Sequence, residues 1–467
     1  MPYDMTEHFD ALILGSGQGG NPLALAFAKA GKKTAVIESK HVGGTCVNEG
    51  CTPTKTMIAS GRVAYLARRG ADYGVSTGEI SVDLGVVRKR KRDIVDSFRS
   101  GNEKRLTTTE NLELIRGLGR FTGPKILEVA LTAGGTRSLQ AETIFINTGL
   151  RNAVPAIPGI DSVPTLNNES IMELDTLPEH LLVLGGGYIG LEFGQLFRRF
   201  GSRVTIIHHG HQLLAHEDPD MVEEVKKILA EDGIDILLET ETIAVNGRPG
   251  ALQLRARRGT SEHLLEGSHL LLAAGRVPNT DALQLEKTGV AIDAHGFIKV
   301  NERLETGVPG IYGMGDVKGG PAFTHISYDD YRILKANLLD GENRTITGRM
   351  VPYTVFIDPQ FGRIGLTEAE ARKQRKDIRV AKMPMTYVAR ALETAESRGL
   401  MKIIVDRQSE LILGAAILGI EGGETASAVQ LAMMGGLKFT ALRDGIFAHP
   451  TLAEALNNVF FQWQDEK

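Results

Sequence analysis

The chain has 467 residues, of which 42% are hydrophobic and 24% are charged, a composition typical of a folded globular protein. Its length predicts roughly three domains. The formal net charge of -4 gives no reason to expect general binding to nucleic acid or to anionic membranes. We therefore expect its partners to be small molecules or another protein chain.

The N-terminus and the cysteine content predict a cytoplasmic protein. The chain lacks a basic start followed by a long apolar run, and no window reaches the roughly 18 uninterrupted apolar residues of a membrane span. Cys46 and Cys51 are the only two cysteines, which excludes a secreted scaffold held together by several disulfides.

The first predicted elements form a dinucleotide-binding unit. Residues 9–14 form an apolar strand, residues 15–20 are rich in glycine, and a helix and a second strand that ends at Glu38 follow. Gly15, Gly17 and Gly20 permit a tight turn and close approach of a pyrophosphate to the helix N-terminus, and Glu38 can accept a hydrogen bond from a ribose hydroxyl. The alternative is an ordinary tight turn.

The same pattern recurs in HLLVLGGGYIGLEFGQLFRRFGSRVTIIH, where Gly185, Gly187 and Gly190 lie between a strand and a helix. Two matches in the correct context predict two nucleotide sites in one chain. The position that corresponds to Glu38 is occupied by His208, so no carboxylate is present to hold a ribose 2'-hydroxyl or to repel a 2'-phosphate. This favours NADPH over NADH. Arg203, His209 and His211 lie close to His208 in the sequence, and we expect Arg203 and His209 to contribute to the same cofactor site. The alternative is that these histidines are merely solvated loop residues.

Two further apolar segments, 139–149 and 268–276, bracket the second glycine motif and look like strands that close a nucleotide domain. We therefore predict an α/β fold with two Rossmann-like dinucleotide-binding domains and a C-terminal α+β domain. The predicted boundaries are residues 1–150 and 274–345 for a discontinuous FAD domain, 151–273 for the NAD(P)H domain, and 346–467 for the third, dimerisation domain.

The most specific string is GGTCVNEGCTPTK, residues 43–55. On an ideal helix the two cysteines would lie about 7.5 Å apart along the axis and about 140° apart around it, so a disulfide requires a distorted turn, which Gly50 and Pro53 permit. A zinc site would need two more ligands at matching spacing, and we predict no metal site. A redox-active disulfide is favoured over a structural one.

These residues resemble the class I pyridine nucleotide-disulfide oxidoreductases, which include dihydrolipoamide dehydrogenase, glutathione reductase and mercuric reductase. The resemblance covers nearly the whole chain and includes TGVPGIYGMGD, which ends at Asp316, and FAHPTLAEAL, residues 447–456. It implies that Asp316 binds the ribityl chain of FAD. It also implies cofactor contacts at Gly44, Thr45, Thr148, Gly149, Gly275 and Arg276.

The resemblance assigns the catalytic roles as well. Cys46 corresponds to the thiol that attacks the acceptor, and Cys51 to the thiol beside the flavin. Lys55 corresponds to the lysine near flavin N5, Glu192 to its ion-pair partner, and Tyr188 to the aromatic gate for nicotinamide. His449 and Glu454 correspond to the acid/base dyad, which reaches the cysteines of the other subunit in a homodimer.

The acceptor is less well defined. Residues 387–406 resemble mercuric reductases, but the chain ends FFQWQDEK without their C-terminal cysteine pair and has His449 where they have tyrosine. FTHISYDDYRI, residues 323–333, resembles reactive-chlorine-resistance reductases that act on hypothiocyanous acid. A disulfide-like, oxidised-sulfur or metal-ion acceptor fits this pattern. The alternatives are a dihydrolipoamide dehydrogenase and a flavin redox sensor without turnover. Glu49, between the cysteines, could raise the pKa of a neighbouring thiol or repel an anionic acceptor. The alternative is that its side chain points to solvent.

Overall fold

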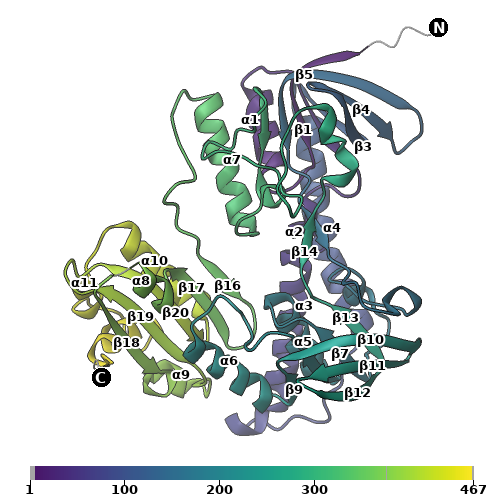
Figure 1. Cartoon of the computed structure of the whole chain (residues 1–467). Coiled ribbons are helices and arrows are strands. Elements are labelled where there is room, and N and C mark those ends of the chain that lie inside the picture. Colours follow the sequence, from purple (N-terminus) through teal and green to yellow (C-terminus); the bar gives the residue numbers. More distant parts are fainter. Residues whose placement is uncertain (1–5, 375, 465–467) are drawn as a thin grey trace. The chain divides into compact units, whose positions relative to one another are not determined.

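The computed structural model describes residues 6–374 and 376–464. The chain forms two compact units, whose elements are labelled in Figure 1. The first unit contains Met1–Thr56, Arg88–Ala153 and Gly275–Arg349, and the second contains Met57–Val87, Val154–Ala274 and Met350–Lys467. Each unit is therefore built from segments that are distant in the sequence.

The first unit is organised around one mixed sheet. Its parallel strands lie in the order β3-β2-β1-β5-β15, and β4 joins β3 to β5 by antiparallel pairing. The strands are β1 (Glu7–Leu14), β2 (Thr34–Glu38), β3 (Leu112–Gly123), β4 (Ile126–Leu131), β5 (Thr136–Ile146) and β15 (Ile311–Gly313), and a short antiparallel ribbon joins β6 (Leu150–Asn152) to β14 (Arg276–Pro278).

Both faces of the parallel strands are buried, which explains why β1 is a continuous apolar run rather than an alternating one. Ala11 and Ile13 pack on one face with side chains from α1 (Gly20–Lys29) and α7 (Thr324–Leu338). Leu12 and Leu14 pack on the other face with side chains from β3, β4 and residues 283–317. The remaining helices that contribute to this unit are α2 (Gly44–Asn48), the first turn of α3 (Cys51–Arg68) and most of α4 (Leu84–Thr108).

The second unit contains a four-stranded parallel sheet, a three-stranded antiparallel sheet and a five-stranded antiparallel sheet, in the orders β13-β7-β8-β9, β10-β11-β12 and β16-β17-β20-β19-β18. The strands of the first two sheets are β7 (His180–Leu184), β8 (Arg203–Ile207), β9 (Ile234–Leu237), β10 (Thr240–Arg248), β11 (Ala251–Arg258), β12 (Ser261–Gly267) and β13 (His269–Leu272), with α5 (Tyr188–Phe200) and α6 (Pro219–Glu231) between them in sequence.

The five-stranded sheet belongs to the C-terminal part of the chain, and α10 packs against two of its strands, β17 and β20. Its strands are β16 (Tyr353–Val355), β17 (Gln360–Gly365), β18 (Ile378–Pro384), β19 (Leu400–Asp406) and β20 (Ile412–Gly419), and the helices are α8 (Glu368–Lys373), α9 (Ala389–Glu393), α10 (Gly422–Met434), α11 (Phe439–Arg443) and α12 (Ala455–Asn458).

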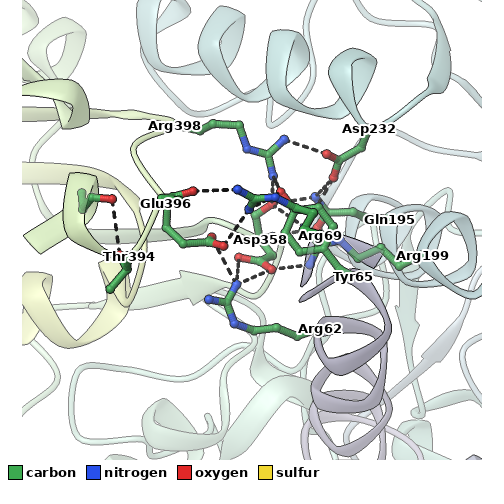
Figure 2. A network of polar contacts seen from close by, with 12 residues as sticks. Arg62, Tyr65, Arg69, Gln195, Arg199, Asp232, Asp358, Thr394, Glu396 and Arg398 are labelled. Carbon is green, nitrogen blue, oxygen red and sulfur yellow. Dashed lines mark hydrogen bonds and ion pairs between the residues drawn. The ribbon is translucent and has the colours of Figure 1, made fainter. Parts of the chain in front are cut away.

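A buried ion network joins three parts of the second unit (Figure 2). Asp358 accepts hydrogen bonds from Arg62 of α3 at 2.6 Å and is ion-paired with Arg199 of α5. The ring of Tyr65 lies 3.9 Å from the guanidinium of Arg199, which adds a cation–π contact. Arg398 pairs with Asp232 at 2.6 Å. The network therefore fastens the C-terminal half of α3 to α5 and to the C-terminal sheet.

The α/β class with two dinucleotide-binding units and an α+β C-terminal region is confirmed by the parallel sheets and by the family matches given below. The predicted boundaries of three domains stay a prediction. The structure divides into two compact units, the second of which includes both the predicted NAD(P)H domain and the predicted C-terminal domain. Within the described part of the chain, no helix has the length and apolar character needed to cross a membrane.

Candidate active site

The first glycine loop connects β1 to α1 and has no room for a side chain at Gly15 or Gly20. A Cβ on Gly15 would lie 2.5 Å from the carbonyl oxygen of Asn147, and a Cβ on Gly20 would lie 2.4 Å from the carbonyl oxygen of Gly15. Gly44 follows the second strand, and its Cβ would lie 2.8 Å from the Cα of Gly17. A cradle of backbone at a helix N-terminus fits a dinucleotide pyrophosphate.

Glu38, at the end of β2, holds this loop from the side. Its carboxylate accepts the Ser16 amide at 3.0 Å and the Ser16 hydroxyl at 2.6 Å, and its other oxygen accepts the amide of Lys40 at 2.7 Å. The side-chain amide of Asn147, the residue after β5, donates to the Gly15 carbonyl at 3.0 Å. The loop is therefore held by side chains from the ends of β2 and β5.

The second glycine loop repeats this packing in the second unit. A Cβ on Gly185 would lie 2.2 Å from the carbonyl oxygen of Ala273, and a Cβ on Gly190 would lie 2.3 Å from that of Gly185. A Cβ on Gly187 would meet nothing within 4 Å, so the outer side of the loop is open to close approach. The residues fit a second dinucleotide, with the phosphates at the N-terminus of α5.

His208 occupies the place that Glu38 has in the first unit. The Gly186 amide donates to His208 Nδ1 at 3.2 Å, so Nδ1 is unprotonated and the hydrogen of the neutral ring lies on Nε2. Burial, followed by the charge of His209, lowers the pKa of His208. The His208 and His209 rings are 4.9 Å apart.

Arg203 was predicted to contribute to the same cofactor site. It begins β8, whereas His208 follows the other end of that strand, and it pairs with Asp235 at 3.4 Å. A five-residue strand separates its two ends by about 13 Å. We therefore omit Arg203 from the proposed cofactor contacts.

The two cysteines lie on separate helices. Cys46 belongs to α2, which ends at Asn48, and Cys51 begins α3, so the two helices are separated by Glu49 and Gly50. The expectation of a distorted turn is met at Gly50, whereas Pro53 lies inside the first turn of α3, where its missing N–H is tolerated.

The Cys46 and Cys51 side chains lie within hydrogen-bonding distance of each other. A hydrogen bond to Cys51, then burial, raise the pKa of Cys46 above its ordinary range, while the hydroxyl of Thr324 and the charge of Lys55 act in the opposite direction. Glu49 is ion-paired with Lys40. Its side chain is 20% exposed and that of Lys40 is 52% exposed, so the ion pair lies at the surface, and an effect of Glu49 on a thiol or an acceptor stays a prediction.

Loops from three parts of the first unit meet near the first glycine motif. Asp316 accepts from the Ser327 hydroxyl at 3.3 Å and pairs with Arg276 at 3.3 Å. The Thr148 hydroxyl donates to the carbonyl oxygen of Asn279 at 2.8 Å. Gly149 and Gly275 both have positive φ, at 66° and 127°, which glycine adopts without strain. Thr45, in α2, accepts the Glu49 amide at 2.9 Å through its carbonyl oxygen.

The remaining predicted residues lie in the second unit. Tyr188 begins α5, and the buried Glu192, one turn later, accepts the Phe356 amide at 2.9 Å. His449 Nδ1 lies 2.9 Å and 3.0 Å from the two carboxylate oxygens of Glu454. Because a carboxylate only accepts, Nδ1 carries the hydrogen and Nε2 is left to exchange a proton. The His449 side chain is 68% exposed.

Sequence reasoning missed Ser16, Asn147, Thr324 and Ser327. Ser16 lies inside the glycine fingerprint and Asn147 inside the TIFINTG strand, but their hydrogen bonds depend on strand order. Thr324 and Ser327 lie in FTHISYDDYRI, and the only signal for them in the sequence is the resemblance of this string to reactive-chlorine-resistance reductases. Among residues 6–374 and 376–464, no group of three or more histidine, cysteine, aspartate or glutamate side chains is arranged to hold a metal ion.

Comparisons with known proteins agree with this architecture. A sequence model of the pyridine nucleotide-disulphide oxidoreductases matches residues 9–330, and a model of their dimerisation domain matches residues 351–460. The chain therefore belongs to the pyridine nucleotide-disulphide oxidoreductase family, which uses FAD and a pyridine nucleotide.

Several individual proteins align with this chain over nearly its whole length. The probable pyridine nucleotide-disulfide oxidoreductase RclA of Escherichia coli is 37% identical over 97% of this chain and 98% of its own length. The mercuric reductase of Bacillus cereus is 32% identical over 96% of this chain and 70% of its own length, and the dihydrolipoyl dehydrogenase of Thermus scotoductus is 32% identical over 96% of each. The solved structure of the HOCl-induced flavoprotein disulfide reductase RclA from Escherichia coli superposes with a TM-score of 0.88 at 36% identity, covering 97% of this chain and 99% of its own.

Proposed function

We propose that the protein is an FAD-dependent reductase in which electrons from NAD(P)H reach the Cys46/Cys51 pair and then a small disulfide-like or oxidised-sulfur acceptor. The observation that carries the proposal is the contact between the two thiols, at a break between helices and beside Lys55 and Thr324. When bound, FAD supplies the two-electron step between pyridine nucleotide and disulfide.

The protein's own residues divide the reduced pair into two unlike sulfurs. A hydrogen bond to Cys51, then burial, raises the pKa of Cys46. By the resemblance, Cys46 is the sulfur that keeps the proton and Cys51 the one that carries the negative charge. This fits Cys51 as the thiolate beside the flavin and Cys46 as the thiol that is deprotonated to attack the acceptor. Lys55 contributes positive charge to the same site.

The roles of the remaining residues follow the resemblance. Glu192 orients Lys55, and its own position is fixed by the Phe356 amide. Tyr188, at the start of α5, covers the nicotinamide site until the coenzyme enters. Asp316 and Arg276 hold the ribityl side of FAD. The pairing of Lys55 with Glu192 is proposed from the resemblance alone, since the two residues belong to different compact units.

His449 and Glu454 act as the acid/base pair for the interchange thiol. Glu454 fixes the ring with Nε2 outward, where it removes the Cys46 proton and returns it to the leaving group. We propose that this dyad serves the cysteines of a second subunit. The match to a dimerisation domain supports a homodimer, as do the exposed apolar side chains near the C-terminus, which are Leu431, Met434, Leu437, Ile446 and Phe461.

The coenzyme is NADPH in preference to NADH, although His208 distinguishes the two less strongly than a charged residue would. Its neutral ring carries no negative charge that would repel a phosphate at the 2' position. The Glu38 carboxylate in the first unit would repel a phosphate. The preference for NADPH rests on this contrast.

The acceptor class rests on the dyad and on the relatives. An intact acid/base pair suits a reaction in which a sulfur leaving group takes up a proton, and RclA is described as an HOCl-induced disulfide reductase. A second candidate is lipoamide, because a dihydrolipoyl dehydrogenase is 32% identical over nearly the full length. Hg(II) is a third, from the mercuric reductase likeness.

The test is anaerobic reduction of the purified holoenzyme with NADPH or NADH, with free thiols counted by alkylation and mass spectrometry. We expect two new thiols, a long-wavelength thiolate absorbance, and rapid reoxidation by one of hypothiocyanous acid, lipoamide, glutathione disulfide or Hg(II). Cys46→Ser should retain flavin reduction and lose turnover of the acceptor. If the flavin bleaches without new thiols and only oxygen or quinones reoxidise it, the cysteine relay is wrong and a flavin redox sensor becomes the better description.

A further inference from the structure

Helix α7 carries three polar residues, Thr324, Ser327 and Asp330, at intervals of three positions. Steps of three residues advance about 4.5 Å along a helix and return close to the same side, so these residues form one stripe. Figure 1 shows α7 in the first unit, where it packs with α1 on one face of the sheet. Each member of the stripe contacts a different part of the candidate site.

The first two members reach the redox pair and a cofactor residue. The Thr324 hydroxyl lies 3.3 Å from Cys51 Sγ. It also hydrogen-bonds Cys46, where it opposes the larger effects of Cys51 and burial that raise the pKa of that thiol. One hydroxyl therefore serves both sulfurs. Ser327, one turn later, donates to Asp316 at 3.3 Å.

The third member, Asp330, is completely buried. It accepts the Gly315 amide at 2.8 Å and pairs with Lys318 at 3.2 Å and Arg349 at 2.7 Å. A buried carboxylate with two cations and a backbone donor is fully engaged and holds its neighbours firmly. It fixes residues 315–318, which include Asp316, against the same helix that presents Thr324.

We propose that Thr324 is a further catalytic residue, whose hydroxyl stabilises the thiolate of the reduced Cys46/Cys51 pair. Ser327 and Asp330 are positioning residues that hold this hydroxyl and the Asp316 loop in one fixed arrangement. The inference rests on the proposed redox function. Uptake of two electrons, which the pyridine nucleotide would supply, would break the Cys46–Cys51 bond, leaving one proton on Cys46 Sγ and the negative charge on Cys51, which accepts the Thr324 hydrogen.

The test compares Thr324→Val, which keeps the shape and loses the hydroxyl, with Thr324→Ser, which keeps the hydroxyl. Each holoenzyme is reduced anaerobically with NADPH, and the thiolate is titrated with pH by its long-wavelength absorbance and by its rate of alkylation with iodoacetamide. Loss of a hydrogen bond to a charged group should raise the apparent thiolate pKa by about one to two units in Thr324→Val. Thr324→Ser should titrate as the wild type does.

The positioning residues are tested by FAD binding. Ser327→Ala removes the hydroxyl bound to Asp316 without touching either sulfur, and should raise the dissociation constant for FAD about ten-fold or more, as expected for one hydrogen bond to a carboxylate. An unchanged dissociation constant would overturn this role.

The outcomes separate the inference from the proposed function. If NADPH produces no new thiols in the wild type, the proposed function fails. If the thiols appear but Thr324→Val titrates like the wild type, only the role of Thr324 is refuted.

Discussion

Asp358→Asn should weaken the second unit strongly, because it removes one charge from a buried network (Figure 2). The Asp358 side chain is 11% exposed and that of Arg199 is 6% exposed, so neither charge is well hydrated. Without the Asp358 carboxylate, the carboxylate left near Arg199 is Asp232 at 3.5 Å. Removing one partner of a buried ion pair costs about 3 to 5 kcal/mol.

Thermal unfolding of the holoenzyme measures this effect, and a fall in Tm of about 6 °C or more is expected for such a loss. Glu241→Gln is the matched control, because Glu241 pairs with Arg257 at 2.6 Å on the surface of the same unit, with side chains 58% and 47% exposed. Breaking an exposed pair should change stability by less than about 1 kcal/mol. If Asp358→Asn lowers Tm no more than this control, the network does not stabilise the unit as argued.

The pH dependence gives a second check on the same residue. Burial acts to raise the pKa of Asp358, but the charges of Arg199 and Arg62 outweigh it and hold the pKa below its ordinary value. A depressed carboxyl pKa stabilises the fold above the ordinary pKa, and this stabilisation is lost as the pH falls through the lowered value. The wild type and Asp358→Asn should therefore approach each other in stability in acid.

Three other predictions concern Glu217, His208 and the Cys46/His449 pair. Burial raises the pKa of Glu217 from 4.5 to about 7, so stability should fall by up to about 3 kcal/mol as the pH rises across that interval; Glu217→Gln should remove this slope in urea titrations at several pH values. His208→Glu should raise the dissociation constant for NADP+ relative to NAD+ by at least about ten-fold, measured calorimetrically, because a carboxylate repels the 2'-phosphate; an unchanged ratio would place His208 away from the ribose. Mixed dimers of Cys46→Ser and His449→Ala should regain partial activity, whereas no recovery after confirmed subunit exchange would contradict a shared site.

Local signals in the sequence located the nucleotide loops and the cysteine pair. Glycine is required where a Cβ would collide with backbone, as at Gly15 and Gly185, and this demand is visible in the fingerprint itself. The continuous apolar runs of β1 and β7 are a second local signal, because strands that are buried on both faces need apolar side chains on both. The α/β class followed from the order of these elements.

Tertiary structure decided which side chains meet at those loops. Thr324 lies 273 residues from Cys51 in sequence, and nothing in either segment specifies their contact. Arg203 lies near His208 in sequence but at the opposite end of an extended strand, so closeness in sequence does not bring it to the same part of the predicted cofactor site. Backbone requirements act within a few residues and are legible in the sequence, whereas hydrogen-bond and ion-pair partners are set by strand order and helix packing, which bring distant segments together.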